Sequence, residues 1–210
     1  MLASLPVVLG LLPVPGSTQD TDGWKLARDK DGIRVYRHEV EGSAFDAVRG
    51  EMRVAGSLES ALAVIWDVAR YPEWMPHTDE IEILEKEAGS LVYYLRSDVP
   101  WPAADRDGVY EIRVTGDARS ATVHFVCRPE RLKANPGYVR IPSCNGSWVL
   151  ERQDQEEEVQ ITYEMESEMG GNIPGWLANM GATNVPYRMM RELRRRMSVE
   201  PYRDSRFPFP

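Results

Sequence analysis

Residues 170–177, Gly-Gly-Asn-Ile-Pro-Gly-Trp-Leu, separate two sequence patterns of different period. Before them, residues 158–168 alternate apolar and polar side chains, with Val159 and Ile161 on one face, as in a strand with one buried side. After them, apolar side chains recur at helical spacing as far as Met197. The two patterns predict a strand that turns through two glycines into a long amphipathic C-terminal helix, whose apolar face packs on the sheet.

The predicted C-terminal helix contains prolines and many methionines. Pro174 suits the first turn, where a missing N–H removes no hydrogen bond, and Pro186 lies inside the helix, where we expect a kink. The flexible thioether side chains of methionines pack adaptably around ligands of varied shape. The apolar stripe consists of Leu177, Met180, Gly181, Val185, Met189, Met190, Leu193 and Met197.

Further strands are predicted upstream, where segments rich in β-branched and aromatic residues lie between turn residues. They span residues 32–37, 45–54, 80–87, 91–98, 108–115, 121–128 and 138–153. Ser57 is placed to cap a helix in which Leu58 and Ile65 share a face, and residues 71–76 are expected to form a short helix or turn. The chain has no internal repeat, so residues 24–198 are predicted to form one α+β domain.

Charge and motif content argue against several functions. The net charge of −8 disfavours nucleic-acid binding, which needs a basic face. The three histidines and two cysteines lack metal-ligand spacing, and no nucleophile elbow, P-loop or dinucleotide motif occurs. We therefore expect no enzyme activity and no cofactor. Cys127 and Cys144 are expected on neighbouring strands, where a disulfide is possible but two free thiols are favoured.

Both ends of the chain differ from the central region. Residues 1–23 include an apolar run with the length of a signal-peptide core, too short to span a bilayer and without a preceding basic residue. A signal peptide would place the protein in the periplasm or outside the cell; a disordered start would leave it in the cytoplasm. Residues 199–210 contain three prolines and mixed charge, and are expected to form a loose tail.

Six short motifs, in unbroken order over about residues 24–197, resemble the START family, the lipid-transfer domains related to the steroidogenic acute regulatory protein. Each motif is weak alone, and their common order makes the resemblance specific. The motifs are Asp31-Gly32-Ile33-x-Val35-Tyr36, Ile65-Trp66-Asp67 with Trp74, Asp105-Arg106-Asp107, Pro136-Gly137-Tyr138-Val139-Arg140, Gly146-x-Trp148, and Gly170-Gly171-x-Ile173-Pro174-x-Trp176-Leu177.

The resemblance implies a helix-grip fold, in which a curved antiparallel sheet wraps around a long C-terminal helix and encloses an apolar tunnel. It also implies one lipid or similar hydrophobic ligand in that tunnel, without a cofactor. Each candidate wall residue is equally compatible with ordinary core packing. The candidates are Tyr110, Ile112, Val123, Phe125, Ile161, Tyr163, Met165, Trp176, Met180, Asn184 and Tyr187.

Two further features bear on the ligand and on its route of entry. Some animal relatives carry a charged pair inside the tunnel, but the strands on either side of Pro100 show no matched inward acid and base. The loop that contains Pro100, Trp101 and Pro102 corresponds in the family to a loop beside the tunnel mouth. Two prolines restrict this loop, so Trp101 either meets a membrane interface or folds back onto the helix as a seal.

The sequence thus predicts a carrier, transfer protein or sensor for a hydrophobic ligand, monomeric and in transient contact with membranes. Two alternatives stay open. A polyketide cyclase or aromatase on the same container fold would need a polar side chain to polarise a ketone, and Tyr163 or Arg113 are candidates. An interaction module without a ligand would instead have a filled interior.

Overall fold

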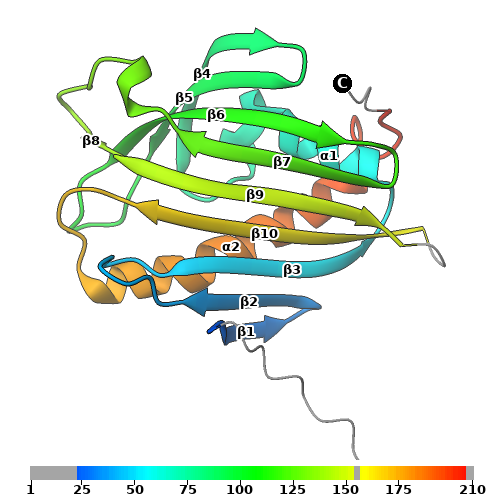
Figure 1. Ribbon diagram of the computed structural model, residues 1–210, viewed down its shortest axis with the longest axis horizontal. Helices are drawn as coiled ribbons and strands as arrows, with labels where there is room; N and C mark the ends of the chain where they lie inside the picture. The colour runs from blue at the N-terminus through cyan, green and yellow to red at the C-terminus, as the bar shows by residue number, and fades with distance from the viewer. Residues whose placement is uncertain (1–22, 154–156, 207–210) are drawn as a thin grey trace, which may run out of the picture.

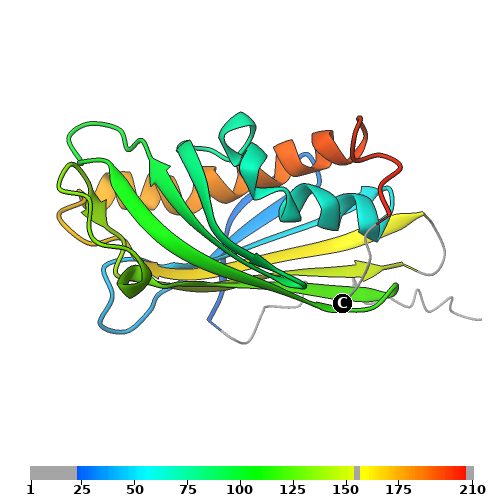
Figure 2. The ribbon, with the colours of Figure 1, turned by 90° about the horizontal axis from the view of Figure 1, so that it is seen from above.

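The computed structural model describes residues 23–153 and 157–206, which form one ten-stranded sheet with two α-helices on one of its faces (Figures 1 and 2). The strand order is β1-β2-β3-β10-β9-β7-β6-β5-β4, with every pair antiparallel except the short β8, which runs parallel to β6. The strands are β1 (Lys25–Lys30), β2 (Ile33–His38), β3 (Ala47–Ala55), β4 (Thr78–Glu87), β5 (Ser90–Ser97), β6 (Arg106–Gly116), β7 (Ser120–Cys127), β8 (Val139–Arg140), β9 (Ser143–Arg152) and β10 (Glu158–Glu168). The helices are α1 (Leu58–Trp66), the 3₁₀ helices η1 (Val68–Glu73) and η2 (Pro129–Arg131), and α2 (Gly175–Met197).

The predicted α+β helix-grip architecture is confirmed. The sheet is curved and open, because β1 and β4 form its two edges and do not pair. Seen from above, α2 crosses the concave face of the sheet and α1 lies beside it (Figure 2). The sheet and the C-terminal helix each bury one apolar face against the other, as their periodicities predicted.

The core fills one end of this arrangement. Leu62 and Ile65 of α1, Leu150 of β9, and Met190 and Leu193 of α2 are almost completely buried together. The Ser57 side chain accepts a hydrogen bond from the Ser60 N–H at 3.0 Å, the predicted N-cap, which stabilises such a helix by about 1 kcal/mol.

Three local predictions were wrong. The sequence Lys25–Lys30 forms an edge strand, β1, which was missed because most of its side chains are exposed and show no apolar alternation. Residues 138–153 form two strands rather than one, interrupted at Ile141 and Pro142, where proline has no N–H for the ladder. Pro174 precedes α2 as its N-cap instead of standing in its first turn; the helix continues through Pro186, where the kink stays a prediction.

The start of the expected loose tail is packed rather than free. The Tyr202 side chain is buried, and its hydroxyl donates a hydrogen bond to Asp67 at 2.9 Å. The Ser60 hydroxyl donates to the Arg203 carbonyl at 2.9 Å. The buried ring and these two hydrogen bonds hold the segment against α1 and its C-cap Asp67, a contact that proline content and mixed charge did not reveal.

The described part of the chain contains no helix that is long and apolar enough to cross a membrane. The N-terminal apolar segment predicted as a signal peptide or disordered start lies almost wholly in residues 1–22, outside the described residues.

Candidate functional site

A cavity of about 550 Å³ lies between the concave face of the sheet and the first half of α2. Its walls come from the strands on the concave side, from η1, and from α2 residues between Leu177 and Met189. The cavity therefore occupies the end of the sheet where α2 begins, while the opposite end is filled by the solid core around α1.

Most of the predicted wall residues line this cavity. They are Tyr110, Ile112, Val123, Phe125, Tyr163, Met165, Met180 and Asn184. Pro100 of the predicted mouth loop also lies at the cavity wall. That these side chains contact a ligand remains a prediction.

Three predicted wall residues lie elsewhere, each for an identifiable reason. Ile161 faces the same side of β10 as Tyr163, but it pairs with Leu150 of β9 in the filled end of the core. Trp176 is 59% exposed because Leu177, the next helical position, takes the inward direction. Tyr187 donates its hydroxyl to Asp31 and so ties α2 to the turn between β1 and β2.

Glycines on the strands explain how aromatic rings can lie flat and leave open space above them. A Cβ at Gly146 would lie 2.3 Å from Cζ of Phe125, and a Cβ at Gly108 would lie 2.6 Å from Cε2 of Tyr110. Each ring therefore rests on bare backbone. The Gly146-x-Trp148 motif consequently has a packing role in shaping the cavity.

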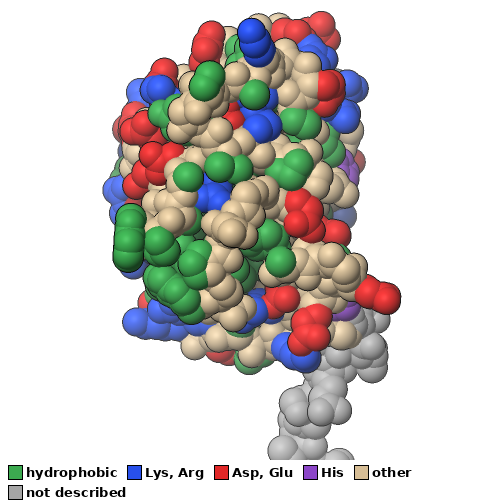
Figure 3. All heavy atoms as spheres, turned by 90° about the vertical axis from the view of Figure 1, so that its left-hand side faces the viewer, with side chains coloured by type: hydrophobic (Ala, Val, Ile, Leu, Met, Phe, Trp, Pro, Cys, Tyr) green, Lys and Arg blue, Asp and Glu red, His purple; other side chains and the backbone are tan. Residues whose placement is uncertain are grey.

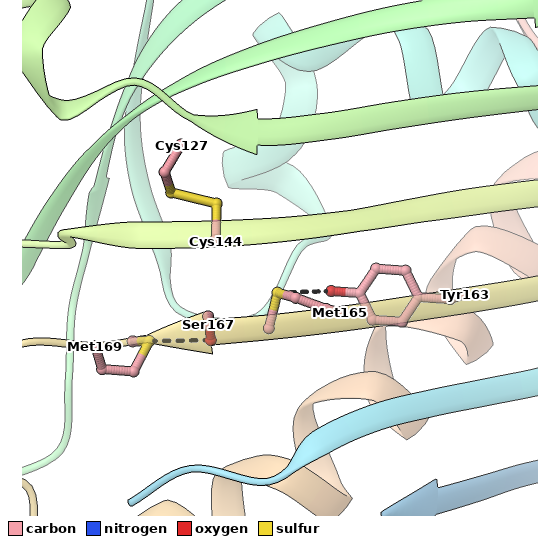
Figure 4. The surroundings of a disulfide bond; sticks show 6 residues. All are labelled: Cys127, Cys144, Tyr163, Met165, Ser167 and Met169. Carbon is pink, nitrogen blue, oxygen red and sulfur yellow. Dashed lines mark hydrogen bonds between the residues drawn. A yellow bond between two sulfur atoms is a disulfide. The ribbon is translucent and has the colours of Figure 1, made fainter. Parts of the chain in front are cut away.

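Sulfur-containing side chains form another part of the wall (Figure 4). On β10, the Tyr163 hydroxyl donates a hydrogen bond to Sδ of Met165 at 3.1 Å. Cys127 and Cys144 lie opposite each other on β7 and β9, with 4.9 Å between their Cα atoms, and form a disulfide. The expectation of two free thiols was therefore wrong, and Cys144 is part of the cavity wall.

Two cavity tyrosines were not predicted. Tyr71 of η1 and Tyr93 of β5 join Tyr110 and Tyr163 at the wall. Burial raises the pKa of all four hydroxyls well above that of free tyrosine, so each stays protonated at physiological pH. Tyr93 was missed because it lies in the continuous apolar run of β5, which gives no alternation to show which side chains face inward.

Charged groups occur at several places on the cavity wall, and one close pair lies on the side of β2. Arg37 of β2 and Asp46 form an ion pair there, and Arg37 also donates to the Asn179 side chain of α2. The described cavity-lining residues of β5 and β6 include no acid–base pair, but beside Pro100 the Asp98 carboxylate lies 3.8 Å from Nδ1 of His77. Arg37 and Asp46 come from the β2–β3 side of the sheet, where no side chain was predicted to face the cavity.

The loop before β6 is exposed at its tip. Trp101 is 88% exposed, so it does not fold back onto α2, and the seal interpretation was wrong. The buried side chain of Arg106 donates to the carbonyls of Ala104 and Gly170, at 3.1 Å for the latter, and so joins this loop to the turn before α2. Hydrophobic side chains gather on this end of the molecule (Figure 3), where Trp176 and Met180 of α2 are also exposed.

Comparisons with known proteins agree with this geometry. Residues 54–194 match the family described as polyketide cyclase / dehydrase and lipid transport. The chain is 32% identical over 174 residues to an uncharacterised protein of Pseudomonas aeruginosa, covering 82% of this chain and 86% of the relative. Human phosphatidylcholine transfer protein is 25% identical over 183 residues, covering 82% of each chain. The crystal structure of a STAR-related lipid transfer protein fragment from Xanthomonas axonopodis is 36% identical, with a TM-score of 0.77 over 85% of this chain and 100% of the fragment.

Proposed function

Because the chain belongs to the START family, we propose that it binds one lipid or similar hydrophobic molecule between the sheet and α2 and carries it as a transfer protein or sensor. The observation that carries this proposal is the mainly apolar cavity of about 550 Å³. That volume lies within the roughly 300–1,000 Å³ range of small-molecule sites. Each Å² of apolar ligand surface removed from water contributes about 25 cal/mol to binding.

The names of two relatives support transport as the purpose of binding. Both the Xanthomonas structure and the human relative are named as lipid transfer proteins. The exposed Trp101, Trp176 and Met180 offer a surface for brief membrane contact, during which a ligand enters or leaves. We include this contact, and a monomeric carrier, in the proposal.

We also propose a location in the periplasm or outside the cell, with the cytoplasm as the alternative. Disulfides persist mainly in oxidising compartments, so the Cys127–Cys144 bond supports export. Fractionation of the source cells, followed by mass determination of the N-terminus, distinguishes the two locations. An uncleaved chain in the cytosol would contradict export.

Polyketide cyclisation is the alternative function, because the family description names it. The residues first considered for it are not well placed. Arg113 follows the inward Ile112, points away from the cavity and pairs with Glu111, while the Tyr163 hydroxyl is engaged by Met165. An interaction module with a filled interior is disfavoured by the cavity itself.

Native mass spectrometry tests the proposal. We expect the purified chain, incubated with a total lipid extract, to retain one apolar molecule per protein, identified after organic extraction. Protein that stays unliganded at every lipid concentration would contradict a carrier. Turnover of an aromatic polyketide precursor, monitored in the same preparation, would favour the cyclase instead.

A further inference from the structure

Two tyrosines on neighbouring strands form a distinct part of the cavity wall. Tyr93 of β5 and Tyr110 of β6 are directly paired across the ladder. Their rings stack with centroids 5.3 Å apart and planes 15° apart, and both line the cavity. Tyr71 meets Tyr93 edge-on, with centroids 5.9 Å apart, which fixes the pair from the side of η1.

The hydroxyls of this pair differ from those of the other cavity tyrosines. The Tyr71 hydroxyl donates to the Ile65 carbonyl at 2.6 Å, and the Tyr163 hydroxyl donates to Met165. Within residues 23–153 and 157–206, neither the Tyr93 nor the Tyr110 hydroxyl has a hydrogen-bond partner. Both hydroxyls lie at the cavity wall with their donors unengaged by protein groups, so they are available to a partner molecule in the cavity.

The electrostatic surroundings restrict the chemistry of that partner. Burial raises the pKa of both phenols, so each remains a neutral donor at physiological pH. The charged groups that act on them are few: Asp107 raises the pKa of Tyr110, and only other tyrosines act on Tyr93. An anionic group placed here would lose its hydration without gaining a cation. A neutral acceptor oxygen meets no such penalty.

The backbone holds one of these donors in place. The Tyr110 ring lies on Gly108, where a Cβ would approach Cε2 at 2.6 Å and the hydroxyl oxygen at 3.0 Å. A side chain at position 108 would displace the ring from its stacked position. Gly108 is thus a positioning residue for the Tyr110 hydroxyl.

From these observations we infer that Tyr93 and Tyr110 form a polar subsite for one uncharged acceptor oxygen, a carbonyl or a hydroxyl, on an otherwise apolar ligand. This inference rests on the proposed function, since it names the chemical class of molecule that the cavity takes. Long-chain ketones, alcohols and esters belong to this class. Hydrocarbons lack the oxygen, and alkylammonium ions offer no acceptor.

Competition binding with matched ligands tests the inference. The uncharged fluorophore N-phenyl-1-naphthylamine reports cavity occupancy, and a long-chain methyl ketone competes with it against the alkane of equal length. We expect the ketone to bind about tenfold more tightly than the alkane to the wild-type protein, the range of one or two well-made hydrogen bonds. The double variant Tyr93→Phe/Tyr110→Phe keeps both rings, so it should bind the alkane unchanged and lose the preference for the ketone.

A control variant and a direct measurement make the outcomes separable. Tyr202→Phe removes a buried tyrosine hydroxyl that is engaged by Asp67 and does not line the cavity, so the ketone preference should persist. The ¹³C resonance of a carbonyl-labelled ketone should move downfield on binding to the wild type, but not to the double variant. Equal affinity for ketone and alkane in the wild type would overturn the inference, as would tighter binding of an alkyltrimethylammonium ion. Failure of the fluorophore, ketone and alkane all to bind would instead refute the proposed function.

Discussion

At the scale of single residues, the Asp107–Arg140 pair shows how a charge can be buried without serving the cavity. Asp107 is fully buried and accepts hydrogen bonds from the Tyr94 hydroxyl at 3.1 Å and from Nε and Nη2 of Arg140, each at 2.8 Å. Arg140 also donates to the carbonyls of Pro129 and Leu132. The pair therefore orders the segment between β7 and β8, which explains two of the six sequence motifs by structure rather than by ligand binding.

Removing the charge of Asp107 should destabilise the fold strongly. Asp107→Asn leaves the mostly buried Arg140 guanidinium without its counter-ion, and loss of one partner of a buried pair typically costs about 3–5 kcal/mol in the free energy of unfolding. Urea denaturation measures this change, and Glu200→Gln, in an exposed pair with Arg203, should stay within about 0.5 kcal/mol of wild type. A loss below about 1 kcal/mol for Asp107→Asn would show that the pair is not important for stability.

The same pair predicts a dependence of stability on pH. Burial alone would raise the pKa of Asp107, but hydrogen bonds and charge from Arg140 outweigh burial and lower it below 3.8. A carboxyl that is more acidic when folded stabilises the protein fully above its unfolded pKa, and this contribution disappears as pH falls through the lower folded value. Unfolding curves between about pH 5 and pH 2 should therefore fall less steeply for Asp107→Asn than for wild type.

A matched pair of valine substitutions distinguishes open space from filled core. Val123 is almost fully buried at the cavity wall, and Val159 is equally buried in the packed end of the sheet. Val123→Trp should project an indole into the cavity and abolish ligand uptake with little loss of stability. Val159→Trp should cost about 1–3 kcal/mol or more, as overpacking does in a filled core. A large fall in melting temperature for Val123→Trp, with ligand binding intact, would assign Val123 to the core.

At the scale of elements, periodicity predicted those elements that bury one face and failed for those that do not. The strand β10 and the helix α2 were predicted because each alternates or repeats with a clear period. The edge strand β1 has no such pattern, and Pro142 divides the segment that was predicted as one strand. Most strand residues that were predicted to line the cavity do so, because alternation along a strand fixes which side chains face the helix. Trp176 and Tyr187 were misplaced because a helix of 23 residues changes its surroundings along its length.

Polar contacts tie the helix α2 to the sheet side along its length, and the large buried apolar side chains Met190, Leu193 and Met197 lie in its second half. Near the cavity, Asn179 accepts a hydrogen bond from Arg37, and Asn184 accepts one from Nη1 of Arg28 at 2.8 Å. Before the helix, Gly170 and Gly171 adopt φ values of 63° and 59°, which glycine tolerates better than other residues. This arrangement suggests that the first half of α2 opens as a lid while the second half stays packed.

Weakening the two asparagine contacts should therefore speed ligand exchange. Asn179→Ala/Asn184→Ala removes two charge-assisted hydrogen bonds, each contributing about 1 kcal/mol, so we expect release of a bound fluorophore to be roughly thirtyfold faster. Stopped-flow displacement measures this rate. Tyr187→Phe removes the contact with Asp31 further along the same helix and should leave the rate unchanged. Equal rates in all three proteins would rule out a lid built from the first half of α2.

At the scale of the whole molecule, charge and exposed apolar surface are separated along α2. The chain carries a net charge of −8, and arginines of α2 gather near its C-terminal end, where Arg191, Arg194 and Arg195 surround a shallow hollow. The exposed Trp101 and Trp176 lie at the other end, beside the cavity. A helix of 23 residues separates the two ends by about 30 Å, several times the screening length in physiological salt. Membrane contact through the tryptophans should thus depend on apolar insertion rather than on attraction between charges.

Substitution of Trp101 tests this separation directly. If the indole buries about 100 Å² in a bilayer, it contributes about 2.5 kcal/mol, so Trp101→Ala should bind zwitterionic vesicles at least tenfold more weakly and transfer a pyrene-labelled lipid between them more slowly. Affinity for the fluorophore in solution should not change, because Trp101 does not line the cavity. Raising the salt concentration should leave zwitterionic binding constant and strengthen binding to anionic vesicles, since it screens repulsion by the acidic protein. Transfer by Trp101→Ala at the wild-type rate would show that this loop does not dock on membranes.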